Sequence, residues 1–330
     1  MTRLTTEFGG ALLVVLMLSP TTEAVAQNLE DAFRQTLREA AKASKLGNAF
    51  QSLSIFGATP GVSTAVFDVD QKEPNTDFAL RTAKLPISHD FAPVIAGIRP
   101  YGELTLGYVH ADEKEAFDLV PGEETKINAD FDTYSALAGI GATIPIVPHL
   151  SLRPIFLAGY SRIIGDARFK GPFAQDLEAA SSGLITDLTI NTLLLGGALQ
   201  ARSAWRLGES IELVADARYN HFYARNFDAS DSVLETADDF GVFNTRAEVD
   251  GPTPLTIFGR ATRWIGFAGY TYLPGDQKDA LGFDSFFELG GGVAIIYPEF
   301  VDGVSGLSVR ASLIVGEDVD GWSAGLSLEF

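Results

Sequence analysis

Apolar and polar residues alternate with a period of two from about residue 61 to the end of the chain. The last segment shows the pattern most clearly, because the even-numbered positions from Trp322 to Phe330 are apolar whereas the odd-numbered positions between them are small or polar. Successive side chains of a β-strand point to opposite faces, so this period is typical of strands with one apolar and one polar face. The pattern predicts an all-β fold for residues 61–330.

The alternation forms twelve segments, most of them roughly 9–17 residues long. Such segments are longer than typical soluble strands of about 5–6 residues, and they suffice for the about 9–11 residues that cross a membrane at a tilt. We therefore predict a transmembrane antiparallel β-barrel of about 12 strands. The segments are 61–69, 77–88, 98–110, 130–145, 150–165, 187–202, 210–225, 239–250, 258–272, 283–297, 305–316 and 320–330.

The connections between these segments alternate in length. The longest ones fall consistently on one side, as in outer-membrane barrels, which have short periplasmic turns and longer outside loops. Several of them are markedly acidic, which is typical of a solvated surface. The connections on the long side are about 70–76, 111–129, 166–186, 226–238, 273–282 and 317–319.

A soluble β-sandwich would alternate in the same way, so other features must decide between the two folds. The length of the segments and an export signal favour a membrane barrel whose apolar face meets lipid. Aromatic residues near the segment ends are expected of the interfacial belts of such a barrel. They include Tyr101, Tyr160, Tyr219, Tyr270, Trp264 and Trp322.

The first 26 residues have the three parts of a secretory signal peptide: Arg3 in a polar start, an apolar run over 11–18, and Ala24-Val25-Ala26 as an A-x-A cleavage site. The apolar run is far shorter than the about 20 residues that span a bilayer. We expect cleavage after Ala26 and localisation in the cell outer membrane. No later run approaches 18 apolar residues, which excludes a helical inner-membrane protein.

Residues 27–60 are predicted to form a helix and a linker. Asn28 is a candidate N-cap, and Gly47 follows the last turn of a helix that carries one narrow apolar stripe. Such a helix could pack on the outside of a soluble domain or lie in a polar lumen. A twelve-strand lumen lies between the filled interior of eight strands and the channel of sixteen, so it would admit one helix about 10–12 Å across. The mostly polar helix 28–47 is thus a candidate lumen plug.

The polar faces of the strands carry charged residues that we expect to line the lumen. They would act as a selectivity lining or as docking partners for the helix. Alternatively, they neutralise one another, because buried charges are normally paired. The residues are Arg99, Glu103, Arg153, Glu212, Asp216, Arg218, Arg246, Glu248, Glu288, Arg310 and Glu329.

Composition excludes several classes of protein. The 330 residues include no Cys, so there is no disulfide, thiolate metal site, Cys nucleophile or acylated lipoprotein anchor. The formal charge of −19 without a basic run argues against nucleic acid as a partner. We also predict no metal site and no cofactor, because the sequence contains no metal-binding spacing of His or Asp residues. We predict no catalytic residue either. His110 and His221 lie on lipid-facing rows, and neither has an obvious Ser at matching depth.

The chain resembles the solitary outer-membrane autotransporter-like β-barrel family, a translocator-type barrel without a passenger, over about residues 61–330. The resemblance implies that the terminal Phe330 is the signal for the barrel-assembly machinery, which is an expected partner together with outer-membrane lipid. The 34 residues between Ala26 and Gly61 leave no room for a passenger domain. The residues that carry the resemblance are Lys84–His89, Arg99–Tyr108, Arg153–Tyr160, Pro254–Arg260, Arg263-Trp264 and Gly325–Phe330.

Three functions remain open at this point. The first is a narrow plugged pore or a translocator-like scaffold. The second is a surface interaction or adhesion protein that uses acidic loops 111–129, 166–186 and 226–238. The third, and the weakest, is an outer-membrane lipid hydrolase. The sequence does not name a solute or a surface partner.

Overall fold

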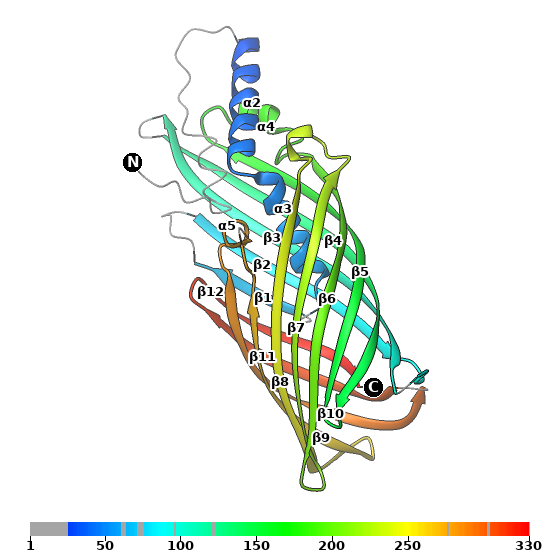
Figure 1. Ribbon diagram of the computed structural model, residues 1–330. Coiled ribbons are helices and arrows are strands. Elements are labelled where there is room, and N and C mark those ends of the chain that lie inside the picture. The colour runs from blue at the N-terminus through cyan, green and yellow to red at the C-terminus, as the bar shows by residue number, and fades with distance from the viewer. Residues whose placement is uncertain are drawn as a thin grey trace.

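The computed structural model describes residues 26–60, 64–70, 76–95, 97–120, 123–275, 277–301 and 304–329. Twelve antiparallel strands each pair with their neighbours in sequence, and β1 pairs with β12, so that the sheet closes into a barrel (Figure 1). The predicted twelve-strand antiparallel barrel is therefore confirmed. The strands are β1 (Thr64–Val69), β2 (Thr76–Asp90), β3 (Arg99–Val120), β4 (Glu123–Val147), β5 (Leu150–Lys170), β6 (Leu188–Leu207), β7 (Ile211–Phe227), β8 (Ala237–Ile257), β9 (Arg260–Tyr272), β10 (Ser285–Val301), β11 (Val304–Gly316) and β12 (Val319–Glu329).

The two ends of the barrel differ. At one end lie α2, α4, α5 and η1 and most of the longer connections between described strands, and we call it the loop end; the other is the turn end (Figure 1). The prediction of an acidic loop at 111–129 was wrong. Strands β3 and β4 continue through this segment as a paired hairpin from Ala111↔Phe131 to Asp118↔Glu124. Asp112 there faces outward whereas Glu113 and Glu115 are buried on the inward face, so a run of charge concealed a strand pattern.

The N-terminal segment forms two helices rather than the single helix 28–47 that the sequence predicts. Helix α2 spans Ala26–Ala43 and α3 spans Leu46–Ala58. Lys45 between them has left-handed backbone angles (φ 54°, ψ 40°), which breaks the helical path. Gly47 is therefore not a C-terminal cap but the second residue of α3, and most of the expected linker is helical.

The two helices occupy different places. Helix α2 stands beyond the loop end of the barrel, where α4 (Ala174–Ser181) and the 3₁₀ helix η1 (Ser232–Leu234) lie against it, and α3 descends into the barrel (Figure 1). Helix α5 (Gln277–Leu281) contacts α3 at the same end. Among the described residues, no helix combines the length and the apolar character needed to cross a membrane.

The outward face of the barrel carries an apolar band. On β3 it includes Leu104 and Leu106, and beyond Tyr108 the outward positions become charged. Tyr108 and Tyr134 on neighbouring strands pack with ring centroids 5.3 Å apart at this boundary. This change from apolar to aromatic to charged positions matches a lipid-facing belt with an interfacial edge.

The inward face is polar in the turn-end half only. In the loop-end half the same rows become mainly apolar, for example from Arg218 and Asn220 to Phe222 and Ala224 along β7, all of which are buried. The expectation of a polar lumen along its whole length was therefore wrong. The physical reason is that an apolar helix fills this half, and apolar wall residues bury its surface.

Candidate functional site

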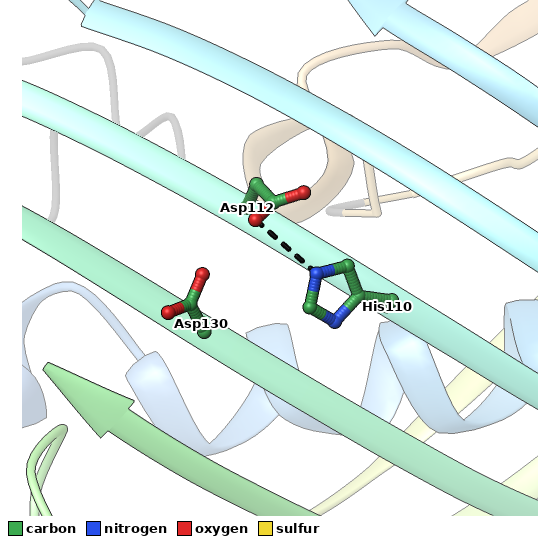
Figure 2. A group of neighbouring side chains, drawn as sticks. All are labelled: His110, Asp112 and Asp130. Atoms are coloured by element: carbon green, nitrogen blue, oxygen red, sulfur yellow. Dashed lines mark ion pairs between the residues drawn. The ribbon is translucent and has the colours of Figure 1, made fainter.

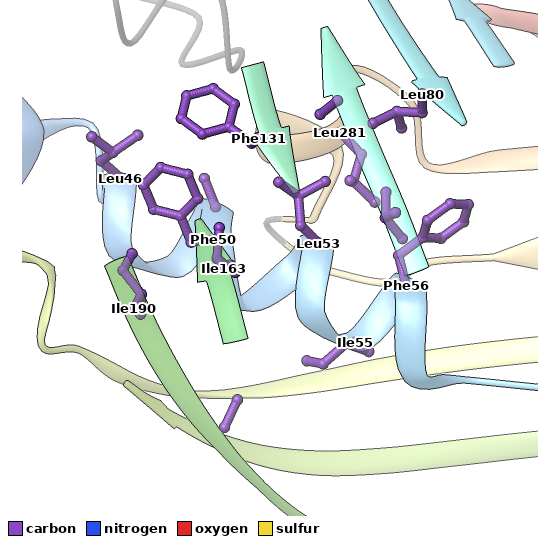
Figure 3. Packing of buried hydrophobic residues seen from close by; sticks show 14 of the residues in the cluster. Leu46, Phe50, Leu53, Ile55, Phe56, Leu80, Phe131, Ile163, Ile190 and Leu281 are labelled. Atoms are coloured by element: carbon purple, nitrogen blue, oxygen red, sulfur yellow. The ribbon is translucent and has the colours of Figure 1, made fainter. Parts of the chain in front are cut away.

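The lumen at the loop end is filled by α3. Every residue of α3 except Asn48 is buried, and Phe50, Leu53 and Ile55 have no exposed surface. Figure 3 shows Leu80, Phe131, Ile163 and Ile190 of four different strands around the helix. A mainly apolar helix is stable only when other apolar groups surround it, and here the barrel wall supplies them.

Aromatic contacts fix both ends of α3. Near its start, the ring of Phe50 meets Phe131 of β4 edge to face at 5.3 Å. Near its end, Phe56 meets Phe67 of β1 at 5.5 Å and Phe283 at 6.0 Å, both edge to face. Such edge-to-face pairs add to the gain from burial and define the orientation of each ring.

Polar contacts set the depth of α3 in the barrel. The Gln51 side-chain amide donates to the carbonyl of Thr236 at 2.8 Å, and Ser161 Oγ of β5 donates to Ser54 Oγ at 2.6 Å. Asn226 Nδ2 donates to the carbonyl of Gly47 at 2.9 Å. These side chains are all buried, so a shift of the helix along the barrel would leave hydrogen-bonding groups without partners in an apolar region.

The last turn of α3 approaches the backbone of β3 closely. A Cβ atom added to Gly107 would lie 2.1 Å from the carbonyl oxygen of Gly57, a distance that real atoms do not adopt. Gly107 is therefore required by contact with the helix.

Replacement of Gly107 by Ala is expected to force α3 away from the wall and to lower the free energy of unfolding by about 1–3 kcal/mol, the usual cost of overpacking. Gly266→Ala is a matched control, because a Cβ there meets nothing closer than 3.7 Å, and it should change stability by less than about 0.5 kcal/mol. Urea unfolding of both variants in micelles, followed by Trp fluorescence, measures the difference. Equal stability would contradict the close contact.

Helix α2 is fastened to the loops above the barrel. Arg34 Nη1 donates to the carbonyl of Ser182 at 3.0 Å, and Arg34 and Arg38 pair with Asp231 at 3.4 and 3.3 Å. Asn48, at the start of α3, donates to Asp238 at 2.6 Å. Asp231 and Asp238 belong to the predicted acidic loop 226–238, so part of the charge of that loop binds the protein's own N-terminal segment.

Helix α5 is held to the turn between β11 and β12. Lys278 Nζ lies 2.7 Å from Asp318, and this hydrogen bond raises the pKa of Lys278 above its usual value. Leu281 and Phe283 then contribute to the apolar cluster around α3. The loops at this end thus hold α3 in place from above.

Below α3, a buried ion pair crosses the lumen. Arg218 of β7 donates through both Nη atoms to the two carboxylate oxygens of Glu103 of β3, each at 2.7 Å. Tyr101 donates its hydroxyl to Glu103 at 2.7 Å, and Arg218 Nε donates to Asn220 at 2.7 Å. The side chains of Glu103 and Arg218 are 5% and 10% exposed, so both charges depend on each other for stabilisation.

A second group of contacts lies next to this pair. Arg153 of β5 pairs with Asp90 at the end of β2 at 2.8 Å, and its guanidinium lies over the ring of Tyr101 at 3.7 Å. It also donates to Thr143 at 2.8 Å and to Gln200 at 3.1 Å. These contacts join five strands across one side of the lumen.

The opposite side of the lumen has its own charge cluster. Glu248 of β8 accepts hydrogen bonds from both Arg246 and Arg310. Arg246 also contacts Glu288 of β10 at 3.4 Å, and Ser312 donates to Glu288 at 2.6 Å. The mid-lumen is therefore bridged by paired charges on both sides, beneath a helix that fills the half above.

The comparison with known families decides what kind of barrel this is. The chain matches the model for the solitary outer membrane autotransporter beta-barrel domain over residues 70–329. The chain belongs to this family. An autotransporter-type barrel of this kind resides in the outer membrane, and its family is a barrel domain rather than a class of enzymes.

Solved autotransporter barrels resemble the chain at low sequence identity. The translocator domain of NalP from Neisseria meningitidis is 15% identical, with 88% of this chain and 97% of that chain covered and a TM-score of 0.46. The transport unit of AIDA-I from Escherichia coli is 10% identical, covering 88% and 98%, with a TM-score of 0.47. The β domain of Bordetella BrkA is 14% identical, covering 81% and 98%, with a TM-score of 0.40. No curated protein sequence matches the chain.

The predicted lumen residues of this autotransporter-type barrel fall into three groups. Glu103, Arg218 and Glu288 lie in the buried mid-lumen contacts. Glu212 lies on the same row of β7 as Asp216, near the turn end, and the side chain of Glu329 lies outside the described residues, as does Phe330. A cavity at the turn end is lined by Arg99, Arg153, Asp216, Arg246, Glu248 and Arg310.

Sequence reasoning missed several residues of these clusters. Asp90 was assigned to a connection, whereas it is the last residue of β2. Tyr101 was taken as an interfacial aromatic, but it is buried and faces the lumen, where it binds Glu103 and Arg153. The odd-numbered row that it shares with Glu103 and Thr105 was a signal that could have located it.

A cluster of titratable side chains lies on the outer face of β3 and β4. His110, Asp112 and Asp130 offer ligand atoms within 4.8 Å of one another, and Figure 2 shows them facing each other across the two strands. His110 lies 2.8 Å from Asp132 and 3.2 Å from Asp112 through its two ring nitrogens. The residues come from two paired strands, so a search for spacing in the sequence could not detect them.

These contacts bear on the lipid hydrolase hypothesis. The polar partners of His110 are carboxylates, and His221 lies 3.6 Å from Asp239 with both side chains exposed. Among the described residues neither ring has a hydrogen bond to a Ser hydroxyl, which an activated Ser nucleophile requires. The arrangement therefore offers no support for a catalytic Ser.

Proposed function

We propose that this protein is a self-plugged, translocator-type barrel that holds its own N-terminal segment, with α3 closing the lumen and α2 displayed beyond the loop end. The observation that carries the proposal is the burial of α3 inside the barrel wall. Two barriers lie in series, because the ion pair Glu103–Arg218 crosses the lumen beneath the helix. On this proposal the resting barrel passes neither ions nor solutes.

The path of the chain supports a translocation step. On our proposal the signal peptide is cleaved after Ala26, so the mature chain begins at α2, at the loop end. It then passes down α3 to mid-barrel and turns back to enter the wall at Thr64, the first residue of β1. If the loop end faces outward, as its longer connections suggest, the N-terminal segment must pass through the barrel during assembly.

The expected partners follow from the same proposal. Outer-membrane lipid would contact the apolar outward band. The barrel-assembly machinery would recognise the C-terminal strand, Val319–Glu329, together with Phe330. Binding of an unknown surface partner to acidic loops is less well supported, because Asp231 and Asp238 already contact α2 and α3.

Thiol labelling tests the placement of α2. The chain has no Cys, so one introduced Cys is the only reactive thiol. Gln35 of α2 is exposed beyond the loop end, and His149 is exposed in the turn between β4 and β5. In intact cells, a maleimide on a polyethylene glycol too large to cross the outer membrane should label Gln35→Cys, whereas His149→Cys should react only after the membrane is opened.

The reverse pattern of labelling would place the loop end in the periplasm and overturn the proposal. Labelling of neither Cys in intact cells would contradict display of α2. Heat-dependent mobility in gels serves as a control that both variants form folded barrels.

A further inference from the structure

A cavity of about 650 Å³ lies in the turn-end half of the lumen, on the side of the ion pair away from α3. Its volume is within the about 300–1,000 Å³ of typical small-molecule sites. Its charged lining residues come from seven strands and consist of Arg99, Arg153, Arg202, Arg246, Arg310, Asp90, Asp216 and Glu248.

The lining of this cavity has an excess of positive charge. Five Arg face three carboxylates, although the whole chain has a formal charge of −19. Glu288 contacts Arg246 from outside the lining, and including it still leaves one guanidinium uncompensated. The cavity is thus a basic site in an acidic protein, and the planar guanidinium is the side chain best suited to bind carboxylate or phosphate groups.

The five Arg differ in how far they are already engaged. Arg153, Arg246 and Arg310 are fixed by Asp90, Glu248 and Glu288. Arg202 makes only a long contact of 3.5 Å to Asp216, and its side chain is 48% exposed. Among the described residues, no hydrogen bond or ion pair holds Arg99, which is also exposed. Donors of Arg99 and Arg202 therefore remain available.

The cavity is accessible from the turn end. Arg99 is the first residue of β3, Asp90 is the last of β2, and Ser151 is the second of β5, so the lining begins where these strands end. Toward the loop end, Glu103 and Arg218 close the path. A solute can enter from the turn end only, and it would bind in a blind vestibule rather than pass through.

We propose that this vestibule binds a small solute that carries at least two carboxylate or phosphate groups, with Arg99 and Arg202 as its recognition residues. The three engaged Arg, whose charges are balanced by Asp90, Glu248 and Glu288, hold the shape of the site. A polymer cannot pass through the barrel at this site, because Glu103 and Arg218 close the inner end of the vestibule. The inference goes beyond the proposed plug, since the vestibule lies on the other side of the ion pair and does not include any residue of α2 or α3.

Calorimetric titration of the folded full-length mature protein in uncharged micelles tests this site. Pyrophosphate and citrate serve as probes for phosphate and carboxylate ligands, and maltose serves as a neutral control. Binding of either anion, and not of maltose, is expected at low ionic strength and should weaken as salt is added. Tighter binding of one probe identifies the class of anion.

Variants locate the binding. Arg99→Gln combined with Arg202→Gln should raise the dissociation constant of the bound anion at least tenfold. Arg168→Gln is the matched control, because Arg168 is exposed on the loop-end part of β5, and it should bind as the unmodified protein does. No binding of either probe at millimolar concentration, or equal binding by the double variant, overturns the proposal.

A Cys at Val214, which lines the vestibule, gives a second measurement that does not depend on the Arg variants. A small water-soluble thiol reagent should modify Val214→Cys, and the bound anion should slow the reaction severalfold. It should leave the reaction of Gln35→Cys unchanged, because α2 lies at the far end of the barrel. Equal slowing at both positions, or none at Val214→Cys, would place the anion elsewhere and overturn the proposal.

Discussion

A variant that lacks residues 27–58 is expected to conduct ions across a planar bilayer, whereas the complete mature protein is expected to show no resolved openings. The deletion removes the helix that fills the loop-end half of the lumen and leaves all twelve strands in place. Twelve strands enclose a lumen intermediate between a filled eight-strand barrel and an open porin, so emptying it leaves space for water and ions. Discrete single-channel steps are the measurement.

The ion pair beneath the helix makes this prediction more specific. Glu103 and Arg218 still cross the lumen when α3 is absent, so the deletion alone should give narrow, low-conductance openings. Combining it with Glu103→Ala and Arg218→Ala should widen the path and increase the conductance. The two alanine substitutions without the deletion should leave the barrel closed, because α3 remains.

Two further variants distinguish the contribution of α3 to closure from that of α2. Deletion of 27–43 removes α2 alone and should leave the barrel silent, because α3 lies deeper. If the larger deletion fails to fold, Phe50→Asp with Leu53→Asp should release α3 from its apolar site and open the barrel in the complete chain. A conducting complete protein, or a folded deletion that inserts but stays silent, would contradict the plug.

The second large effect is expected at the ion pair itself. Glu103→Ala should lower the free energy of unfolding by about 3–5 kcal/mol, because it leaves the charge of Arg218 buried without a partner. Two hydrogen bonds of 2.7 Å from Arg218 and one from Tyr101 are lost at once. Urea unfolding of the barrel in micelles, followed by Trp fluorescence, measures this loss.

The double variant Glu103→Ala with Arg218→Ala separates the pair from the two individual side chains. It should cost less than the sum of the single variants by about 0.5–3 kcal/mol, because no unpaired charge remains. Lys126→Ala is the control, since Lys126 pairs with Glu124 at 2.9 Å on the surface with both side chains more than half exposed, and it should cost less than about 1 kcal/mol. Strict additivity at Glu103 and Arg218 would show that they do not depend on each other.

The architecture of the barrel could be predicted from the sequence because side-chain direction in a strand has a period of two. Each of the twelve predicted segments corresponds to one observed strand, even the irregular segment 258–272, which is β9 (Arg260–Tyr272). The extension of β3 and β4 through 111–129 was missed because its acids raised the expectation of a loop. Charge content is a weaker signal than alternation wherever strands extend beyond the membrane.

The sequence pattern placed the lumen helix at 28–47 rather than at α3 for a physical reason. A polar lumen calls for a polar helix, so helix 28–47 was the natural candidate. The loop-end half of the lumen is instead mainly apolar. The helix buried there is the adjoining α3, whose residues had been assigned mainly to a linker. The apolar surface of α3 is stabilised only by an apolar wall, and the apolar wall only by an apolar helix. The pattern of residues along the chain does not reveal which distant surfaces will be in contact.

The sequence by itself determined the number and order of the strands and the rows of side chains that share a face, and the export signal stays a prediction. These properties depend on local periodicity, which each segment carries in its own residues. Only the tertiary structure decided which end of the lumen is filled, which charges pair across it and where a basic cavity remains. Contacts such as Glu103–Arg218 join residues 115 positions apart, and barrel closure and register determine whether they meet.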